Sequence, residues 1–206
     1  MLDRLRALLF PPACVACDRA GPVLCAACAP PPGLAVHFAL GAVPARALGP
    51  YEGPLRTAIV AMKRGLRDPL DAFAALLDAI PIDATLVPVP TSRARAAQRG
   101  FDQATQLVRR VARRRGLPAA ELLRKHGRPQ AGRDRAARLA AAGRFSLRRG
   151  VALPEAVTLL DDVCTTGATL IDAAATLRGA GVRIAGFVVL ARAGGTPSDR
   201  ERSWPA

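Results

Sequence analysis

Residues 157–169 read Val157-Thr-Leu-Leu-Asp-Asp-Val-Cys-Thr-Thr-Gly-Ala-Thr169, a pattern that indicates the fold class of this chain. The first four residues are apolar or β-branched and predict a short buried strand, Val157 to Leu160. Asp161 and Asp162 follow where we expect that strand to end, and a hydroxyl-rich turn leads to a helix expected to begin near Leu170. In an open parallel α/β sheet, ligands bind at the carboxyl ends of such strands.

The turn after the two acids suits a phosphate group, and it comprises Cys164, Thr165, Thr166, Gly167, Ala168 and Thr169. Backbone N–H groups at the start of a helix attract anions, and Thr hydroxyls add further donors. Gly167 has no Cβ, so the backbone there can approach a phosphate closely. We interpret Cys164 as a buried spacer without a catalytic role. The alternative for the whole stretch is ordinary capping of a helix by acidic and Thr side chains.

The two acids and the turn resemble the phosphoribosyl pyrophosphate (PRPP) motif of the type I phosphoribosyltransferases. That motif has four apolar residues, two acids, two spacers, Thr-Thr-Gly and a closing Thr. The resemblance implies that residues 164–169 bind the 5-phosphate and that Asp161 and Asp162, the predicted catalytic acids, bind the ribose hydroxyls. The sequence contains neither GxxxxGK[ST] nor GxGxxG, so the usual nucleotide-binding loops are not competing explanations.

The length of 206 residues suits one α/β domain with a small appendage, and 50% hydrophobic residues suffice for a core. Apolar runs are far shorter than a membrane span. The first twelve residues are too short and too interrupted for a secretory signal, and they predict a short amphipathic helix that Pro11 and Pro12 end. We therefore expect a cytoplasmic protein without a membrane span.

Four cysteines near the amino terminus form two C-x₂-C pairs, Cys14 with Cys17 and Cys25 with Cys28. Four thiolates at this spacing suit tetrahedral Zn²⁺, which would supply most of the folding free energy of so small a module. Disulfides or a redox pair are the alternatives, and a cytoplasmic location argues against disulfides. We predict a short helix and zinc ribbon in residues 1–33 and a phosphoribosyltransferase-like domain in residues 34–206.

The net charge of +14 is concentrated in one segment, Arg93 to Arg149, which holds 17 Lys and Arg residues against three acids. Such a segment predicts a polyanionic partner, because lysine and arginine neutralise phosphates. A solvated basic surface without a partner is the alternative. Phe101 and Phe145 are the aromatic residues of this segment. Contact with a phosphate backbone is therefore favoured over base stacking.

Hydrophobic periodicity predicts most of the remaining elements. The expected helices are 51–65, 68–80 and 101–115, and the expected strands are one or two within 34–48, then 85–90, 122–123 and 183–192. We expect Arg93 to Gly100 to be a basic loop and Lys125 to Gly143 to be a mobile charged flap. The basic candidates for the pyrophosphate end of a ligand are Lys63, Arg93, Arg95, Arg99, Lys125, Arg128 and Arg133.

The chain as a whole resembles the ComF family, whose members join an amino-terminal zinc ribbon to a phosphoribosyltransferase-type domain. The resemblance rests on the cysteine pairs, the PRPP loop, Tyr51-Glu-Gly-Pro-Leu with Lys63, Val87-Pro-Val-Pro90, Arg99-Gly-Phe-Asp-Gln103, Gln130 and Arg138. Two residues depart from the family pattern: Asp102 and Ala141 each stand where the family usually has Asn.

This resemblance implies a PRPP-binding protein with structural Zn²⁺ and with Mg²⁺ bound alongside PRPP. It also implies a role in the uptake of single-stranded DNA during natural transformation, with other competence proteins as partners. An active phosphoribosyltransferase that transfers ribose 5-phosphate to a nucleobase or amine is the alternative. The basic segment favours the first function, whereas the intact acids and Thr-rich loop leave the second open.

Overall fold

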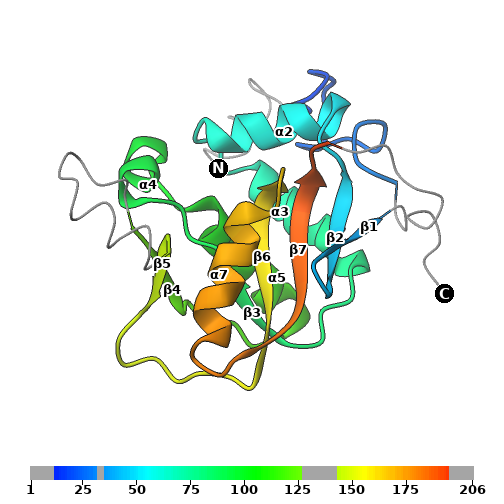
Figure 1. The fold of residues 1–206 in the computed structure, drawn as a ribbon. Coiled ribbons are helices and arrows are strands. Elements are labelled where there is room, and N and C mark those ends of the chain that lie inside the picture. The colour runs from blue at the N-terminus through cyan, green and yellow to red at the C-terminus, as the bar shows by residue number, and fades with distance from the viewer. Residues whose placement is uncertain (1–11, 32–34, 127–142, 195–206) are drawn as a thin grey trace.

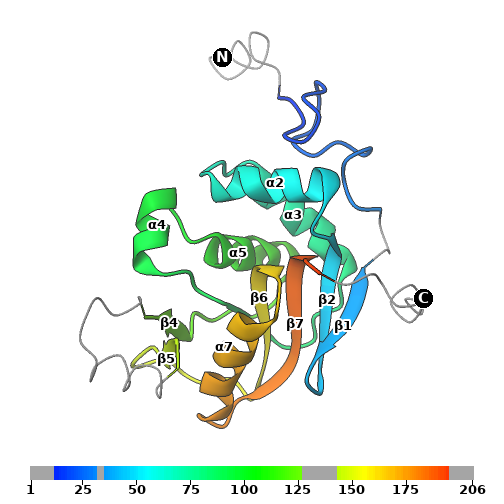
Figure 2. The same cartoon turned by 45° about the horizontal axis from the view of Figure 1, so that its top comes forward.

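The computed structural model describes residues 12–31, 35–126 and 143–194 (Figures 1 and 2). Its helices are α2 (Gly53–Lys63), α3 (Pro69–Leu76), a short 3₁₀ helix η1 (Leu77–Ala79), α4 (Arg93–Arg99), α5 (Gln103–Arg115) and α7 (Ala168–Arg178). Its strands are β1 (Val36–Leu40), β2 (Val43–Pro50), β3 (Thr85–Pro88), β4 (Leu123–Lys125), β5 (Phe145–Leu147), β6 (Ala156–Cys164) and β7 (Arg183–Arg192).

Five strands form the central sheet in the order β1-β2-β7-β6-β3. Strands β2, β7, β6 and β3 are mutually parallel, and β1 pairs antiparallel with β2 at one edge. Leu159 of β6 lies opposite Phe187 of β7 and Val87 of β3, which sets the register at the centre of the sheet. Strands β4 and β5 form a separate antiparallel pair. The predicted α/β fold with a mostly parallel sheet is confirmed.

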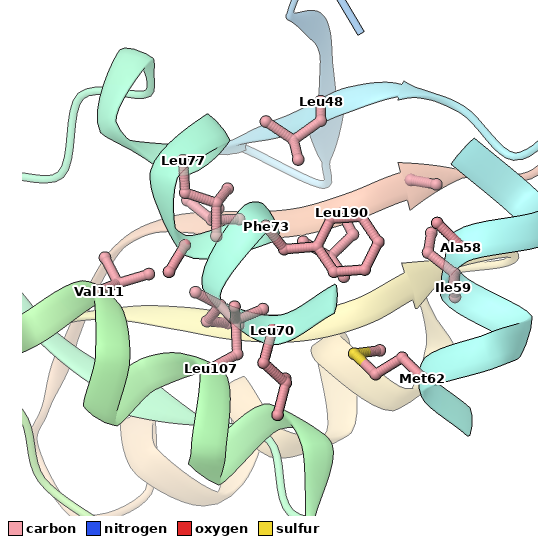
Figure 3. Packing of buried hydrophobic residues seen from close by; sticks show 14 of the residues in the cluster. Leu48, Ala58, Ile59, Met62, Leu70, Phe73, Leu77, Leu107, Val111 and Leu190 are labelled. Carbon is pink, nitrogen blue, oxygen red and sulfur yellow. The ribbon is translucent and has the colours of Figure 1, made fainter. Parts of the chain in front are cut away.

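Helices cover both faces of the sheet: α2, α3 and α5 lie on one face and α7 lies on the other (Figure 2). Successive residues of a strand point to opposite faces, so Leu159 packs in the cluster on the α7 face and Leu160 in the cluster on the other. Figure 3 shows the cluster on the face that α2, α3 and α5 cover, which contains Leu70 and Phe73 of α3 and Leu107 of α5. Burying each such side chain contributes about 1.5–3 kcal/mol.

Helix α4 corrects the prediction that Arg93 to Gly100 is a loop. The hydroxyl of Ser92 accepts a hydrogen bond from the Arg95 backbone N–H at 3.4 Å, and Gly100 ends the helix with φ +78°. No residue of α4 is buried, so the helix lacks the apolar periodicity that the sequence analysis relied on. The Ser and Gly caps were the available signal.

Strand β6 is longer than predicted, because it continues through Asp161 and Asp162 to Cys164. Strand β7 keeps pairing with it along this whole length, whereas pairing with β3 ends at Pro88 and Leu160. Both acids are therefore held by β7 on one edge, while the β3 edge beside them is open. Strand β5 was not predicted. Within the described residues, the other expected helices and strands are present, within a few residues of their predicted limits.

Several predictions fall on residues that the structure does not describe. These are the helix in residues 1–10, the flap residues 127–142, including Arg128, Gln130, Arg133, Arg138 and Ala141, and the boundary between residues 33 and 34. Within the described ranges, we find no helix with the length and apolarity needed to cross a membrane. Across the predicted boundary, Cys14, Leu24 and Cys25 share a buried cluster with Leu48 and Leu55.

Candidate functional site

A polar cleft of about 150 Å³ lies at the carboxyl ends of β3 and β6. Side chains from α2, α4, α5, β4, β6, α7 and the segment after β3 meet there, so elements far apart in the sequence build one site. Its polar residues are Lys63, Thr91, Arg95, Arg99, Asp102, Gln103, Lys125, Asp161, Asp162 and Thr169. This is the position where open parallel sheets bind their ligands.

Seven of the predicted site residues line this cleft, whereas residues 164–168 of the predicted phosphate loop are not among its lining residues. Both acids line it together with Thr169, and so do four of the five described pyrophosphate-side candidates, Lys63, Arg95, Arg99 and Lys125. The fifth, Arg93, is exposed at the start of α4 and is not among the lining residues. The structure therefore brings acidic and basic groups from distant segments to one place, as a sugar with phosphate substituents would require.

The two acids differ in their surroundings. Asp162 Oδ2 lies 3.1 Å from Lys63 Nζ, and the Asp162 backbone N–H donates to Asp161 Oδ1 at 2.8 Å. Burial and the neighbouring Asp162 charge raise the pKa of Asp161 to about 8, although Lys125 and Lys63 act in the opposite direction. Asp161 Oδ2 and Asp162 Oδ1 take no hydrogen bond from the described residues, so both oxygens can accept from hydroxyl groups of a ligand.

The loop between β6 and α7 is largely exposed, apart from the buried Cys164 and Gly167. Thr165, Thr166 and Ala168 are exposed, and the Ala168 N–H donates to the Thr166 hydroxyl at 3.4 Å. Gly167 precedes α7 with φ +75°, and no side chain among the described residues caps that helix. A Cβ at Gly167 would lie 2.5 Å from Leu40 Cδ2, so a larger residue would also crowd the β1–β2 hairpin.

Cys164 is the one member of the predicted loop whose side chain is buried, at 2% exposure. It packs in the apolar cluster on the α7 face, and burial raises the pKa of its thiol. These surroundings agree with the interpretation of Cys164 as a spacer. Any contact of this residue with a ligand would therefore come from its backbone.

Three cleft residues received no role from the sequence: Thr91, Asp102 and Gln103. Asp102 Oδ2 accepts the Thr91 N–H at 2.6 Å, and Asp102 Oδ1 accepts the Thr105 N–H at 3.0 Å. Asp102 thus caps α5 and holds the segment after β3 beside it. Asp102 and Gln103 belong to the motif Arg99-Gly-Phe-Asp-Gln103. The sequence does not indicate which groups they contact.

The β4–β5 pair, which carries Lys125, is bound to the first turns of α7. Asp172 Oδ2 accepts from the Arg144 Nε at 2.8 Å and from the Arg144 backbone N–H at 3.0 Å. Arg144 Nη2 also donates to the Ala168 carbonyl oxygen at 2.8 Å. Lys125 lies opposite Phe145 in this pair, with Nζ 5.3 Å from the centre of its ring. These contacts fix the position of Lys125 relative to the loop before α7.

Part of the basic segment is neutralised by acids that lie elsewhere in the chain. The ion pairs of this segment are Arg109–Glu121, Arg148–Glu121, Arg110–Asp71, Arg114–Asp78 and Arg144–Asp172. Three of those acids come from α3, η1 and α7, which the count along the sequence placed outside the segment. By contrast, the arginines of α4 form no ion pair with any described residue. Among the described residues, arginines that are not in an ion pair are therefore more concentrated near the cleft than along α5.

The four amino-terminal cysteines come together as predicted, with their sulfur atoms all within 4.8 Å of one another. Cys17 Sγ and Cys25 Sγ are 3.8 Å apart, which matches the edge of a tetrahedron with Zn–S bonds of about 2.3 Å. The Cys25 N–H points at Cys14 Sγ at 3.5 Å. Burial by itself would raise the pKa of Cys14. Hydrogen bonds from the backbone of Cys25, Ala16 and Cys17 outweigh this effect and lower the pKa to about 6. The cluster fits structural zinc.

Comparisons with known proteins agree with this description. No protein-family model matches the chain. The chain is 36% identical over 85 residues to the competence protein ComFC of Streptococcus pneumoniae, a match that covers 41% of this chain. The matched stretch spans 37% of the length of ComFC.

Among solved structures, the allosteric regulatory enzyme of purine biosynthesis matches 58% of this chain and 24% of its own, with 22% identity and a TM-score of 0.42. The orotate phosphoribosyltransferase of Aeropyrum pernix matches 68% of this chain and 59% of its own, with 15% identity and a TM-score of 0.36. Adenine phosphoribosyltransferase of Leishmania donovani matches 66% and 73%, with 14% identity and a TM-score of 0.38.

These TM-scores are low, so the description of the fold rests on the strand order and the helices of this chain itself. The sequence match is more informative about the family, because ComFC is a protein of the predicted type. The match to ComFC, together with a four-cysteine cluster that precedes an α/β sheet, confirms the predicted resemblance of this chain to the ComF family.

Proposed function

We propose that the cleft binds PRPP together with Mg²⁺. The observation that carries this proposal is the meeting of two carboxylates with four basic side chains at the carboxyl ends of β3 and β6. The loop of residues 164–169, at the amino end of α7, would bind the 5-phosphate through backbone N–H groups and Thr hydroxyls. Mg²⁺ would enter with the pyrophosphate, whose oxygens suit this ion.

Within this proposal, the acids and the cations have separate roles. Asp161 and Asp162 each keep an oxygen that can accept from the ribose hydroxyls, and Lys63 holds Asp162 in place at 3.1 Å. Arg95, Arg99 and Lys125 would bind the pyrophosphate, because their charges lie in the cleft and are not paired with a described carboxylate. Anchoring both ends of the ligand would position the ribose between them.

The double variant Asp161→Asn with Asp162→Asn tests this assignment. Calorimetric titration with Mg²⁺–PRPP should show binding by the wild type and a loss of at least about 100-fold in the variant, since both acidic side chains that would bind the ribose hydroxyls are replaced by amides. Asp71→Asn, on the exposed surface of α3, is the matched control and should bind normally. Unchanged PRPP affinity in the double variant would refute the site.

We propose further that this ComF-like chain assists DNA uptake, as the name of its relative, competence protein ComFC, suggests. Arg93 of α4, which lies outside the cleft lining, and the remaining basic surface would contact the backbone of single-stranded DNA. Zn²⁺ on Cys14, Cys17, Cys25 and Cys28 would be structural. Other competence proteins and a cytoplasmic location belong to the same proposal.

Binding of single-stranded DNA across a salt series, with and without Mg²⁺–PRPP, tests this role. Each phosphate that the protein neutralises should steepen the logarithmic salt dependence by about 0.7. A steep dependence that PRPP alters would connect the cleft with the basic surface. Absence of binding near physiological salt would refute the DNA role.

An active phosphoribosyltransferase is the second candidate function. The observation that favours it is the intact pair Asp161 and Asp162 beside four cations, which is more than a purely structural domain requires. Release of pyrophosphate from PRPP in the presence of a panel of nucleobases and amines would distinguish the two. Turnover with one acceptor, abolished in the double Asp variant, would establish the enzyme.

A further inference from the structure

Gln103 lies at the start of α5, lines the cleft and is only 3% exposed. Its side-chain amide offers one acceptor oxygen and two donor hydrogens. The oxygen accepts a hydrogen bond from Arg99 Nη1 at 3.1 Å, but the amide nitrogen, Nε2, has no partner among the described residues. A buried donor without an acceptor destabilises the fold, so its retention beside a ligand cleft points to a ligand.

The neighbouring arginine settles which way the amide faces. A guanidinium group only donates, so Arg99 must face the amide oxygen, and the nitrogen must face elsewhere. The adjacent carboxylate of Asp102 accepts backbone N–H groups from Thr91 and Thr105 and takes no hydrogen bond from Gln103 Nε2. Nε2 therefore remains a buried donor without a partner among the described residues, on a residue that lines the cleft.

The residues that line the cleft differ in the ligand groups that they can bind. Asp161 and Asp162 supply acceptors, which suit the hydroxyl groups of a sugar. Gln103 supplies a neutral donor beside the positive charge of Arg99, and this pairing suits an oxygen that only accepts, as in a phosphate group. By its chemistry, the donor thus belongs with the cations that would bind phosphate groups.

We propose that Gln103 Nε2 donates a hydrogen bond to the pyrophosphate of PRPP and helps to select ligands that carry a pyrophosphate over ribose 5-phosphate. Arg99 orients the amide through Oε1 and adds its own charge. This inference rests on the proposed binding of PRPP and assigns a specificity-determining contact within it. It also explains why Gln103 is buried although its amide is not satisfied within the protein.

Gln103→Glu tests the inference with almost no change in shape. The variant keeps an oxygen for Arg99 but replaces the Nε2 donor by an acceptor, which would repel a phosphate. Calorimetric titration should show at least about tenfold weaker binding of Mg²⁺–PRPP and of Mg²⁺–pyrophosphate, as expected for a lost hydrogen bond to a charged group. Affinity for ribose 5-phosphate should stay within about twofold of the wild-type value.

The matched control is Gln106→Glu on the same helix. Gln106 Oε1 also accepts from an arginine, Arg110 Nη1, at 3.0 Å, but Gln106 does not line the cleft. This control should bind all three ligands like the wild type. Gln103→Met, which removes the amide at similar volume, provides a second variant if the Glu variant fails to fold, and it should weaken the same two ligands.

The outcomes separate the inference from the function on which it rests. Wild-type binding of PRPP with unchanged affinity in Gln103→Glu and Gln103→Met would overturn the role of Gln103 and leave the PRPP site standing. Equal weakening of ribose 5-phosphate would also overturn it, because the amide would then contact the sugar phosphate. If the wild type binds neither PRPP nor pyrophosphate, the proposed function fails and the inference fails with it.

Discussion

The cysteine module, residues 12–31, and the sheet domain, residues 35–126 with 143–194, differ in what holds their side chains in place. The module buries little beyond Cys14, Leu24 and Cys25, and its order centres on four sulfur atoms. The sheet domain buries apolar side chains on both faces of β6 and β7. Removal of the metal ion should therefore unfold the cysteine module. The sheet domain should stay folded without its ligand.

Removing zinc should produce the largest effect. Structural zinc contributes apparent folding free energies of about 10–16 kcal/mol in small modules, so chelation should unfold residues 12–31. Hydrogen exchange followed by mass spectrometry should then lose protection around Cys14 and Cys25, while β6 and β7 stay protected. Cys17→Ser should have the same effect, and Cys164→Ala, outside the cluster, should retain its zinc. Protection that survives chelation would show that the contacts with Leu48 and Leu55 suffice.

The pH dependence of the sheet domain should be the next largest effect. Because the folded state raises the pKa of Asp161 to about 8, it binds a proton there that the unfolded chain has already lost. The resulting stability is complete below the ordinary carboxyl pKa and is lost as the pH rises through about 8. The free energy of unfolding of the ligand-free protein should fall by up to about 1.4 kcal/mol for each pH unit between these two values.

Asp161→Asn should remove this pH dependence and be more stable than the wild type above pH 8, while binding PRPP less well. Asp83→Asn, an exposed carboxyl outside the cleft, is the control and should keep the wild-type slope. Urea unfolding at a series of pH values measures both. A wild-type stability that rises between pH 5 and 8, with the same slope in Asp161→Asn, would contradict the assignment.

Gly167→Ala should have a smaller effect that connects stability with binding. The residue has φ +75°, a conformation that costs a residue with a Cβ about 1–2 kcal/mol, and Leu40 must move aside. Thermal unfolding should show this loss, and PRPP affinity should fall because the loop before α7 shifts. Gly116→Ala, also at positive φ but with open space around it, should lose similar stability and keep its affinity.

Breaking one of the ion pairs on α5 should have the smallest effect. Arg110 pairs with Asp71 at 2.9 Å, and the Asp71 side chain is 70% exposed, so the pair contributes at most about 1 kcal/mol. Asp71→Asn should change the free energy of unfolding by less than that amount and should not alter zinc content. It should also free one positive charge and slightly strengthen the binding of single-stranded DNA at low salt. A larger loss in the free energy of unfolding would mean that this ion pair stabilises the fold more than its exposure suggests.

The parts of the fold that periodicity encodes were predictable from the sequence. Helix α5 shows its apolar face as Leu107, Val108 and Val111, and β7 shows an unbroken run of buried residues, because both elements pack against the sheet. Helix α4 was missed because it buries nothing. The end of β6 was misplaced because pairing with β7, which no local pattern reports, carries the strand through Asp161 and Asp162.

The sequence by itself determined the chemistry that the chain can offer: four thiols at zinc-binding spacing, adjacent acids, a Thr-rich loop and an excess of arginine. These features are local, so their spacing is enough to identify them. Only the tertiary structure decided which groups meet, because the cleft joins Lys63, Gln103, Lys125 and Asp162 from four different elements. It also decided which arginines are already neutralised and that the Gln103 amide stays unpaired, since burial and hydrogen bonding depend on neighbours distant in the chain.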